Sequence, residues 1–211
     1  MKNTKLNIND LQLVNNRAKF NLDVPKNITM ISDIFFTNNF KLFVVGGAVR
    51  DALLNKNPKD WDLATNATPD QIKEMMLNAG ISTILTGEQF GVINVFVDSE
   101  EFEIATFRMD SVESDGRRPD SVTFTTIEED VKRRDLSINA LFFDIKTSEV
   151  VDLVGGIEDI KNAVVRTVGS ARDRFNEDRL RILRAIRFTA RFDSKLDTGI
   201  IKALTEDNSL E

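Results

Sequence analysis

The chain has 211 residues and a net charge of −6, and its 41% hydrophobic and 29% charged residues are typical of a globular protein with a sizeable core. It has no cysteine and no histidine, which excludes disulfide-linked partners and catalysis by imidazole and removes the ligands of most zinc sites. Its apolar runs are too short to cross a membrane and its polar N-terminus lacks a secretion signal, so we expect a cytoplasmic protein with no membrane partner.

The side chains that remain for chemistry are carboxylates, arginines and lysines, which favour a hard metal ion such as Mg²⁺ with oxygen ligands. Positive charge is concentrated in residues 166–191, which contain eight arginines and three acids. A basic segment in an otherwise acidic chain indicates one specific anionic ligand more than general binding of polyanions.

The predicted elements are mostly strands followed by a helical end. Residues 1–24 are predicted to be an extension without a clear element. Apolar spacing and turn residues predict helices at 28–36, 48–54 and 69–79. Extended segments are predicted at 41–45, 60–64, 81–85, 91–97, 101–108, 122–126, 141–145 and 150–153. The polar segment 110–120 is predicted to be a mobile loop and 170–192 an arginine-rich helix, so the fold class is α+β with a helical appendage.

Gly46 and Gly47 lie between the predicted strand 41–45 and the predicted helix 48–54. A strand that runs into two glycines and then a helix exposes backbone N–H groups, and glycine lets a phosphate approach them closely. Arg50, one turn into the helix, can add positive charge to the same phosphate. The alternative is an ordinary strand–helix turn with a surface ion pair.

Asp60 and Asp62 are two residues apart in a segment predicted to be extended, so their carboxylates project from the same face. Two carboxylates that close together repel each other unless a cation lies between them, and Mg²⁺ takes such oxygen ligands. The pair follows the candidate phosphate loop by one helix. The alternative is a pair of solvated carboxylates on an exposed strand.

Arg134 and Asp135 form a third candidate pair, in which Arg134 would meet a phosphate and Asp135 would accept a hydrogen bond from a ribose hydroxyl. These side chains could instead stabilise a junction between a helix and a strand.

A fourth group lies on the predicted C-terminal helix, where a helical wheel places four arginines in one sector beside Asp178. Those arginines are Arg181, Arg184, Arg187 and Arg191. The predicted core-facing stripe consists of Ile182, Leu183, Ile186 and Ala190. Like charges in one sector repel each other unless an anion binds, which favours a binding role. The alternative is a solvated face with a Glu177–Arg181 ion pair.

These blocks, in this order, resemble the class II tRNA nucleotidyltransferases, which are the CCA-adding enzymes, and the related bacterial poly(A) polymerases. The matching motifs are GGAVRD, DWD, RRDLSINA, DLVGGIED and EDRLR, and the resemblance runs from about residue 28 to residue 205. It implies a polymerase-β-like nucleotidyltransferase head with a mixed sheet and flanking helices at 25–153. The start of a helical neck would follow at 154–211.

The resemblance also implies Mg²⁺-dependent addition of CMP and AMP, from CTP and ATP, to the 3′ end of tRNA. Asp60 and Asp62 would hold the metals, with Glu103 as a candidate third carboxylate. The residues that would bind the nucleotide are Gly46, Gly47, Arg50, Arg134, Asp135, Asp178, Arg181, Arg184 and Arg187.

Within that set, the resemblance implies that Asp178 and Arg181 read the base while Arg184 and Arg187 contact the phosphates. A carboxylate accepts from the exocyclic amine of cytosine or adenine, whereas uracil and guanine present a carbonyl there and leave polar groups unpaired.

Two alternatives to CCA addition remain open. One is poly(A) polymerase activity, although the segment Gly87–Gly91 resembles CCA-adding enzymes. In this family a shortened loop goes with CC-only addition, so the resemblance of the loop 115–119 implies that A is added as well. The other is a nucleotide-binding fragment without turnover, because the body and tail that follow the neck in this family are missing from the 211 residues.

Overall fold

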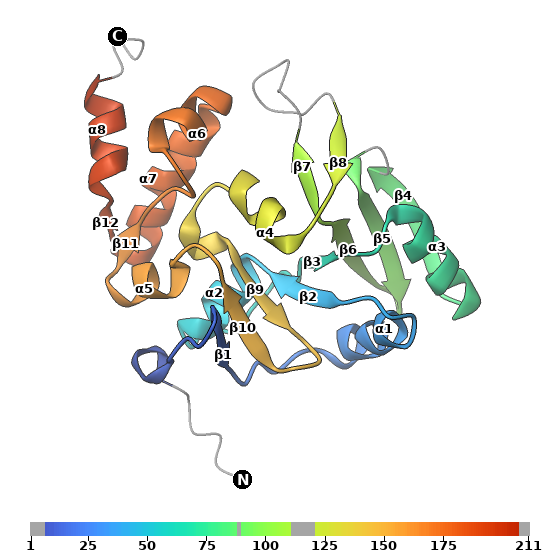
Figure 1. The fold of residues 1–211 in the computed structure, drawn as a ribbon. Helices are drawn as coiled ribbons and strands as arrows, with labels where there is room; N and C mark the ends of the chain where they lie inside the picture. The colour runs from blue at the N-terminus through green and yellow to red at the C-terminus, as the bar shows by residue number, and fades with distance from the viewer. Residues whose placement is uncertain (1–6, 88–89, 111–120, 207–211) are drawn as a thin grey trace.

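The computed structural model describes residues 7–87, 90–110 and 121–206 (Figure 1). Beyond Asp110, the loop predicted at 110–120 lies outside the described residues. The helices are α1 (Lys26–Thr37), α2 (Gly47–Leu53), α3 (Pro69–Asn78), α4 (Ile127–Asp130), α5 (Gly156–Lys161), α6 (Ala171–Glu177), α7 (Leu180–Phe192) and α8 (Thr198–Glu206). Single 3-10 turns are η1 (Ile8–Asp10), η3 (Val131–Arg133) and η4 (Ser137–Asn139).

The strands are β1 (Arg17–Lys19), β2 (Leu42–Val45), β3 (Leu63–Thr65), β4 (Ser82–Gly87), β5 (Val92–Val97), β6 (Glu100–Thr106), β7 (Arg108–Asp110), β8 (Val122–Phe124), β9 (Leu141–Asp144), β10 (Glu149–Asp152), β11 (Val164–Val165) and β12 (Lys195–Leu196). These elements confirm the predicted α+β class. The predicted helices at 28–36, 48–54 and 69–79 match α1, α2 and α3 to within two residues, and Thr68 caps α3 as its side chain accepts from the backbone of Gln71.

Eight strands of the described part form one mixed sheet in the order β1-β10-β9-β2-β3-β6-β5-β4. Neighbouring strands in this sheet are antiparallel except β3 and β6, which are parallel with Leu63 opposite Ile104. In that register the residue before Leu63 lies beside the residue before Ile104. The exception therefore places Asp62 next to Glu103.

Two clusters of buried side chains cover the two faces of the sheet, which is why β2 and β9 are buried at every position. The larger cluster joins the sheet to α1 and α3 through residues such as Ile31, Phe35 and Met76. The smaller is built around three packed aromatic rings, Phe43, Phe107 and Phe142.

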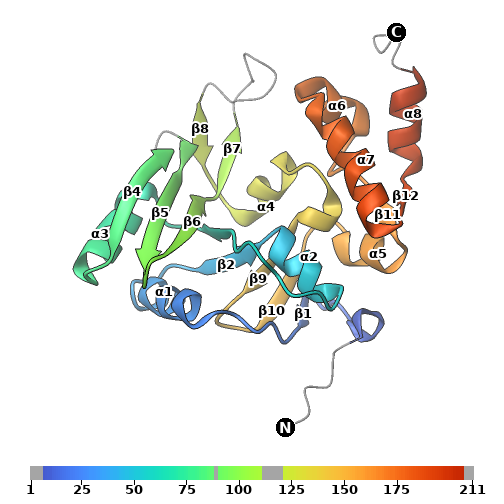
Figure 2. The same cartoon turned by 180° about the vertical axis from the view of Figure 1, so that it is seen from behind.

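A third buried cluster belongs to the helical end, where α6, α7 and α8 pack against one another and against β11. Figures 1 and 2 show these helices grouped at one end of the sheet, with α2 between them and β2. The cluster includes Leu136 and Ile138 from the segment that leads into β9, so the helical end shares its core with the head.

The N-terminal segment differs from the prediction of an extension at 1–24. Residues 17–19 form β1, which pairs with β10 at the edge of the sheet, and Leu11, Ala18 and Phe20 are buried in the larger cluster. The described part of this segment therefore packs as a component of the head.

The single helix predicted at 170–192 is wrong, because α6 ends at Glu177 and α7 begins at Leu180. Asp178 separates them with an extended backbone (φ −151°, ψ 109°), so it does not share a helical wheel with Arg181.

The predicted core-facing stripe of this helix is also mostly wrong. Ile182, Ala185 and Phe188 are buried, whereas Leu183 is 63% exposed and Ile186 is 49% exposed. Ala190 is exposed as well. Burial of the large Phe188 ring turns the helix toward α2, where the cation of Arg50 lies over that ring.

Candidate active site

A cavity of about 620 Å³ lies where β2, α2, η4 and α7 meet, and it collects most of the predicted site residues. The predicted residues that line it are Gly46, Gly47, Arg50, Asp60, Asp62, Arg134, Asp135, Arg184 and Arg187. The lining residues that the sequence did not single out include Lys56, Lys59 and Phe188. A cavity of about 680 Å³ between α6 and α8 contains none of the predicted residues.

The glycine turn at the start of α2 forms one wall of the cavity. Gly46 has φ +67° and ψ −123°, a conformation in which a side chain would be strained, and its N–H donates to the carbonyl of Leu141. Its own carbonyl accepts from the N–H of Arg50, so α2 starts directly at Gly47. The turn between strand and helix was therefore predicted correctly.

Asp60, Asp62 and Glu103 gather at the edge of this cavity. A second cavity of about 480 Å³ is lined by all three and shares Lys59, Asp60 and Asp62 with the first. Burial raises the pKa of Asp62, and the charge of Asp60 adds to this while Arg134 opposes it. Burial, followed by the charge of Asp62, also raises the pKa of Glu103. Asp62 is therefore close enough to Asp60 and to Glu103 for their carboxylate charges to repel its own.

The donor set suits Mg²⁺. The side chains of Asp60, Asp62 and Glu103 make no hydrogen bond or ion pair within the described part of the chain. All three stay open to solvent on one side, although surrounding protein atoms partly desolvate Asp62 and Glu103. No group of three or more acidic side chains among the described residues is arranged to hold a metal ion by itself. Mg²⁺ is commonly held by one or two carboxylates, waters and substrate phosphates, so two carboxylates beside a phosphate-sized basic cavity fit it.

Arg50 lines the cavity, but its side chain also has several partners within the protein. Its side chain is only 4% exposed, and its Nε and NH2 lie 2.9 Å and 2.7 Å from Oδ1 of Asp51. NH1 donates to the side chain of Asn139. The guanidinium also lies over Phe188 and Phe192, 5.1 Å and 4.8 Å from their ring centroids. Arg50 therefore joins α2 to α7, and its charge is already balanced.

Most arginines of α7 have an acidic partner. The prediction that they repel one another until an anion binds is therefore wrong. Arg184 Nε lies 2.6 Å from Oδ2 of Asp135, and Arg181 NH1 lies 2.8 Å from Oε2 of Glu177. Arg191 lies 3.9 Å from Asp51. Arg187 makes no ion pair among the described residues, but its Cζ is 5.4 Å from the centroid of Phe188. Local acids and aromatic faces therefore stabilise this charge even before an anion binds.

Asp178 and Arg181 do not line the cavity, unlike the other predicted nucleotide-binding residues. The carboxylate of Asp178 accepts from the N–H of Leu180, and Arg181 takes part in the Glu177 ion pair that was considered as an alternative. Both remain at the junction of α6 and α7.

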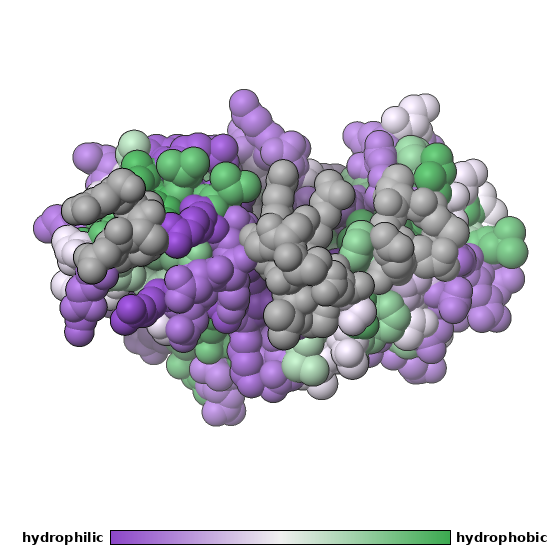
Figure 3. Space-filling model, turned by 90° about the horizontal axis from the view of Figure 1, so that it is seen from above, coloured by the Kyte–Doolittle hydropathy of each residue, from purple (hydrophilic) through white to green (hydrophobic). Residues whose placement is uncertain are grey.

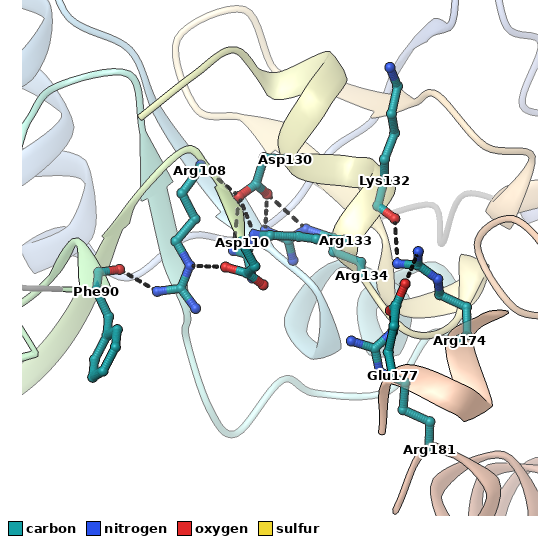
Figure 4. Close-up of polar contacts among 10 residues, drawn as sticks. All are labelled: Phe90, Arg108, Asp110, Asp130, Lys132, Arg133, Arg134, Arg174, Glu177 and Arg181. Atoms are coloured by element: carbon teal, nitrogen blue, oxygen red, sulfur yellow. Dashed lines mark hydrogen bonds and ion pairs between the residues drawn. The ribbon is translucent and has the colours of Figure 1, made fainter. Parts of the chain in front are cut away.

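Asp130 is a residue of this region that sequence reasoning missed. It is 1% exposed and bonds to Arg133 and Arg134, the first two residues of the RRD motif (Figure 4). The detectable signal was its spacing, because an acid three and four residues before two arginines is placed to pair with both.

Seen from above, the surface between the helical end and the middle of the molecule is mainly hydrophilic (Figure 3).

We predict that Asp62→Asn makes the metal-free protein slightly more stable at pH 7, by less than about 1 kcal/mol because Asp62 is exposed. The pKa of Asp62 is raised in the fold, so wild-type stability falls as the pH rises from the unfolded pKa of about 3.9 through the folded pKa. The Asp62→Asn variant lacks this fall in stability. The difference in unfolding free energy between variant and wild type should therefore vanish below the unfolded pKa.

Urea unfolding in EDTA measures this effect, and repeating it with Mg²⁺ should stabilise the wild type more than the variant. A variant that is less stable than the wild type in EDTA would contradict the repulsion at this site.

We predict that Arg50→Met lowers the free energy of unfolding by about 3 kcal/mol, because it leaves the Asp51 carboxylate with only the 3.9 Å contact to Arg191. The matched control is Arg187→Met, which lies on the same cavity without an ion pair to a described residue and should change stability by less than about 0.5 kcal/mol. Urea unfolding followed by circular dichroism compares the two. If both substitutions change the free energy of unfolding by the same small amount, Arg50 does not stabilise the fold and its predicted role as a phosphate ligand is favoured.

Comparisons with known proteins bear on the identity of this site. The model of the Poly A polymerase head domain matches residues 42–166. The CCA-adding enzyme of Enterococcus faecalis is 43% identical over 172 residues, which are 81% of this chain and 41% of that protein. This chain therefore spans less than half the length of that relative.

Solved structures agree with these matches. The Bacillus stearothermophilus CCA-adding enzyme in complex with CTP is 34% identical with a TM-score of 0.75, covering 87% of this chain and 43% of that one. A tRNA nucleotidyltransferase complexed with a primer tRNA and an incoming ATP analog is 29% identical with a TM-score of 0.70, covering 86% and 50%. The mixed sheet with flanking helices thus has the expected head fold, and the chain belongs to the Poly A polymerase head domain family of nucleotidyltransferases.

Proposed function

We propose that this chain is the catalytic part of a cytoplasmic enzyme that adds CMP and AMP, from CTP and ATP, to the 3′ end of tRNA with Mg²⁺ as its cofactor. The observation that carries the proposal is the placement of Asp60 and Asp62 between a basic cavity and a second cavity. The identity of 43% to a CCA-adding enzyme supports the choice of reaction within the family.

The basic cavity suits the triphosphate. It is lined by the glycine turn at Gly46 and Gly47 and by Arg134, Arg184 and Arg187. Backbone N–H groups and guanidinium groups bind phosphate oxygens well. Phosphoryl transfer needs the attacking and leaving oxygens roughly in line, so the RNA 3′-hydroxyl would approach from the side of the second cavity.

Asp60 and Asp62 would hold the metal, and Glu103 would be a third carboxylate near it. Bound Mg²⁺ supplies Lewis-acid chemistry, which activates the attacking hydroxyl and stabilises charge on the departing pyrophosphate. No histidine base is required, which suits a chain without histidine. Asp135 would accept from the ribose hydroxyl, as a carboxylate oxygen can accept more than the bond from Arg184.

The test is an extension assay with Mg²⁺, labelled CTP or ATP, and tRNA that lacks its terminal CCA. Addition of two C residues and one A is expected. Addition of A alone in long runs would favour the poly(A) polymerase alternative. Saturable binding of CTP without extension would favour the alternative of a nucleotide-binding unit that needs further domains for turnover.

We predict that Arg181→Ala changes nucleotide choice, because an acceptor edge of the base loses its donor at a cost of about 1–3 kcal/mol, or about 5- to 150-fold in selectivity. Arg184→Ala is the matched control on the same helix and should weaken CTP, ATP, UTP and GTP alike, since phosphate is common to them. Incorporation of the four nucleotides by each variant measures the difference. If Arg181→Ala incorporates all four nucleotides equally poorly while Arg184→Ala changes the preference among them, the assignment of base reading to Arg181 and phosphate contact to Arg184 is wrong.

A further inference from the structure

The Asp130 carboxylate lies at the centre of a polar network (Figure 4), and one member of that network, Arg134, lines the basic cavity. Oδ1 accepts from Arg133 Nε at 2.9 Å and from the N–H of Arg108 at 3.2 Å. Oδ2 accepts from Arg134 Nε at 3.1 Å and from Arg134 NH2 at 2.9 Å. This carboxylate is buried, so its negative charge is balanced only by these neighbours.

The network restricts Arg134 on two sides. Asp130 occupies the edge of the guanidinium that carries Nε and NH2, and Phe142 lies under its flat face with Cζ 4.6 Å from the ring centroid. NH1 has no hydrogen-bond partner among the described residues, and Arg134 lines the cavity. The donor that remains is therefore fixed in place before any ligand arrives.

The charge of the cluster is not fully balanced. Three guanidinium groups share two carboxylates, and the members are Arg108, Arg133, Arg134, Asp110 and Asp130. Arg133 contacts both carboxylates and does not line the cavity. The surplus positive charge can therefore attract an anion to Arg134, which is the member of the cluster that lines the cavity.

We propose that Asp130 is a positioning residue that fixes the Arg134 guanidinium for a nucleotide phosphate. This inference rests on the proposed function, since it assigns the nucleotide to the cavity. A guanidinium whose Nε and NH2 both donate to one carboxylate oxygen loses little freedom when it binds phosphate, whereas a free one must first be ordered.

The test measures equilibrium binding of CTP, and of inorganic tripolyphosphate, in the presence of Mg²⁺. Asp130→Asn keeps the size of the side chain and removes its charge, and it should weaken both ligands about 10- to 100-fold. The same substitution should have no further effect in an Arg134→Ala background, because Asp130 acts through that arginine. In an Arg133→Ala background its effect should persist.

Asp152→Asn controls for stability, since Asp152 is buried and accepts from four backbone N–H groups but contacts no arginine. It should destabilise the fold without changing the affinity of the folded protein for tripolyphosphate. If Asp130→Asn does not fold, Arg134→Lys replaces it. Lysine cannot donate to Asp130 Oδ2 from two nitrogens, so this variant should bind both ligands nearly as weakly as Arg134→Ala.

Wild-type affinity in Asp130→Asn or Arg134→Lys would overturn the inference and leave the proposed function standing. So would a full effect of Asp130→Asn in the Arg134→Ala background. If the wild-type protein itself binds neither ligand, the proposed function and this inference both fail.

Discussion

The side-by-side placement of Asp62 and Glu103 depends on one constraint, the parallel pairing of β3 with β6 in an otherwise antiparallel sheet. The register of that pair places the two carboxylates next to each other, and Asp60 completes an acidic edge that makes no ion pair within the described residues. Burial and mutual repulsion raise the pKa of Asp62 and Glu103, so the fold accepts an unfavourable charge arrangement. A cation at this edge would relieve it, which links the topology to metal-dependent chemistry.

The basic side of the cavity is arranged differently, because nearly every arginine has a local partner. Asp130 holds Arg134, Asp135 holds Arg184, and Asp51 holds Arg50. The stacked rings of Phe188 and Phe192 contact the cations of Arg50 and Arg184, and the ring of Phe142 contacts Arg134. Donors held in this way are preorganised, so a phosphate gains charge-assisted bonds without first ordering flexible side chains.

Much of the site was predictable from sequence because its signals are local. Gly46 and Gly47 interrupt a strand before a helix, and Asp60 and Asp62 line the same two cavities. The extended segment predicted at 60–64 begins only at Leu63, so both acids lie just before β3 and not on a strand face. The helical wheel failed beyond Glu177, since an extended residue such as Asp178 resets the phase of the next helix. Periodicity also missed that Phe188 would be buried against Arg50, because that contact joins residues far apart in sequence.

The most direct measurement of the central claim is anomalous diffraction from crystals grown with CTP and Mn²⁺ in place of Mg²⁺. The account predicts an anomalous peak within bonding distance of the Asp60 and Asp62 carboxylates, with the triphosphate against Gly46, Gly47 and Arg134. A metal bound away from these acids, or a triphosphate in the cavity between α6 and α8, would contradict it.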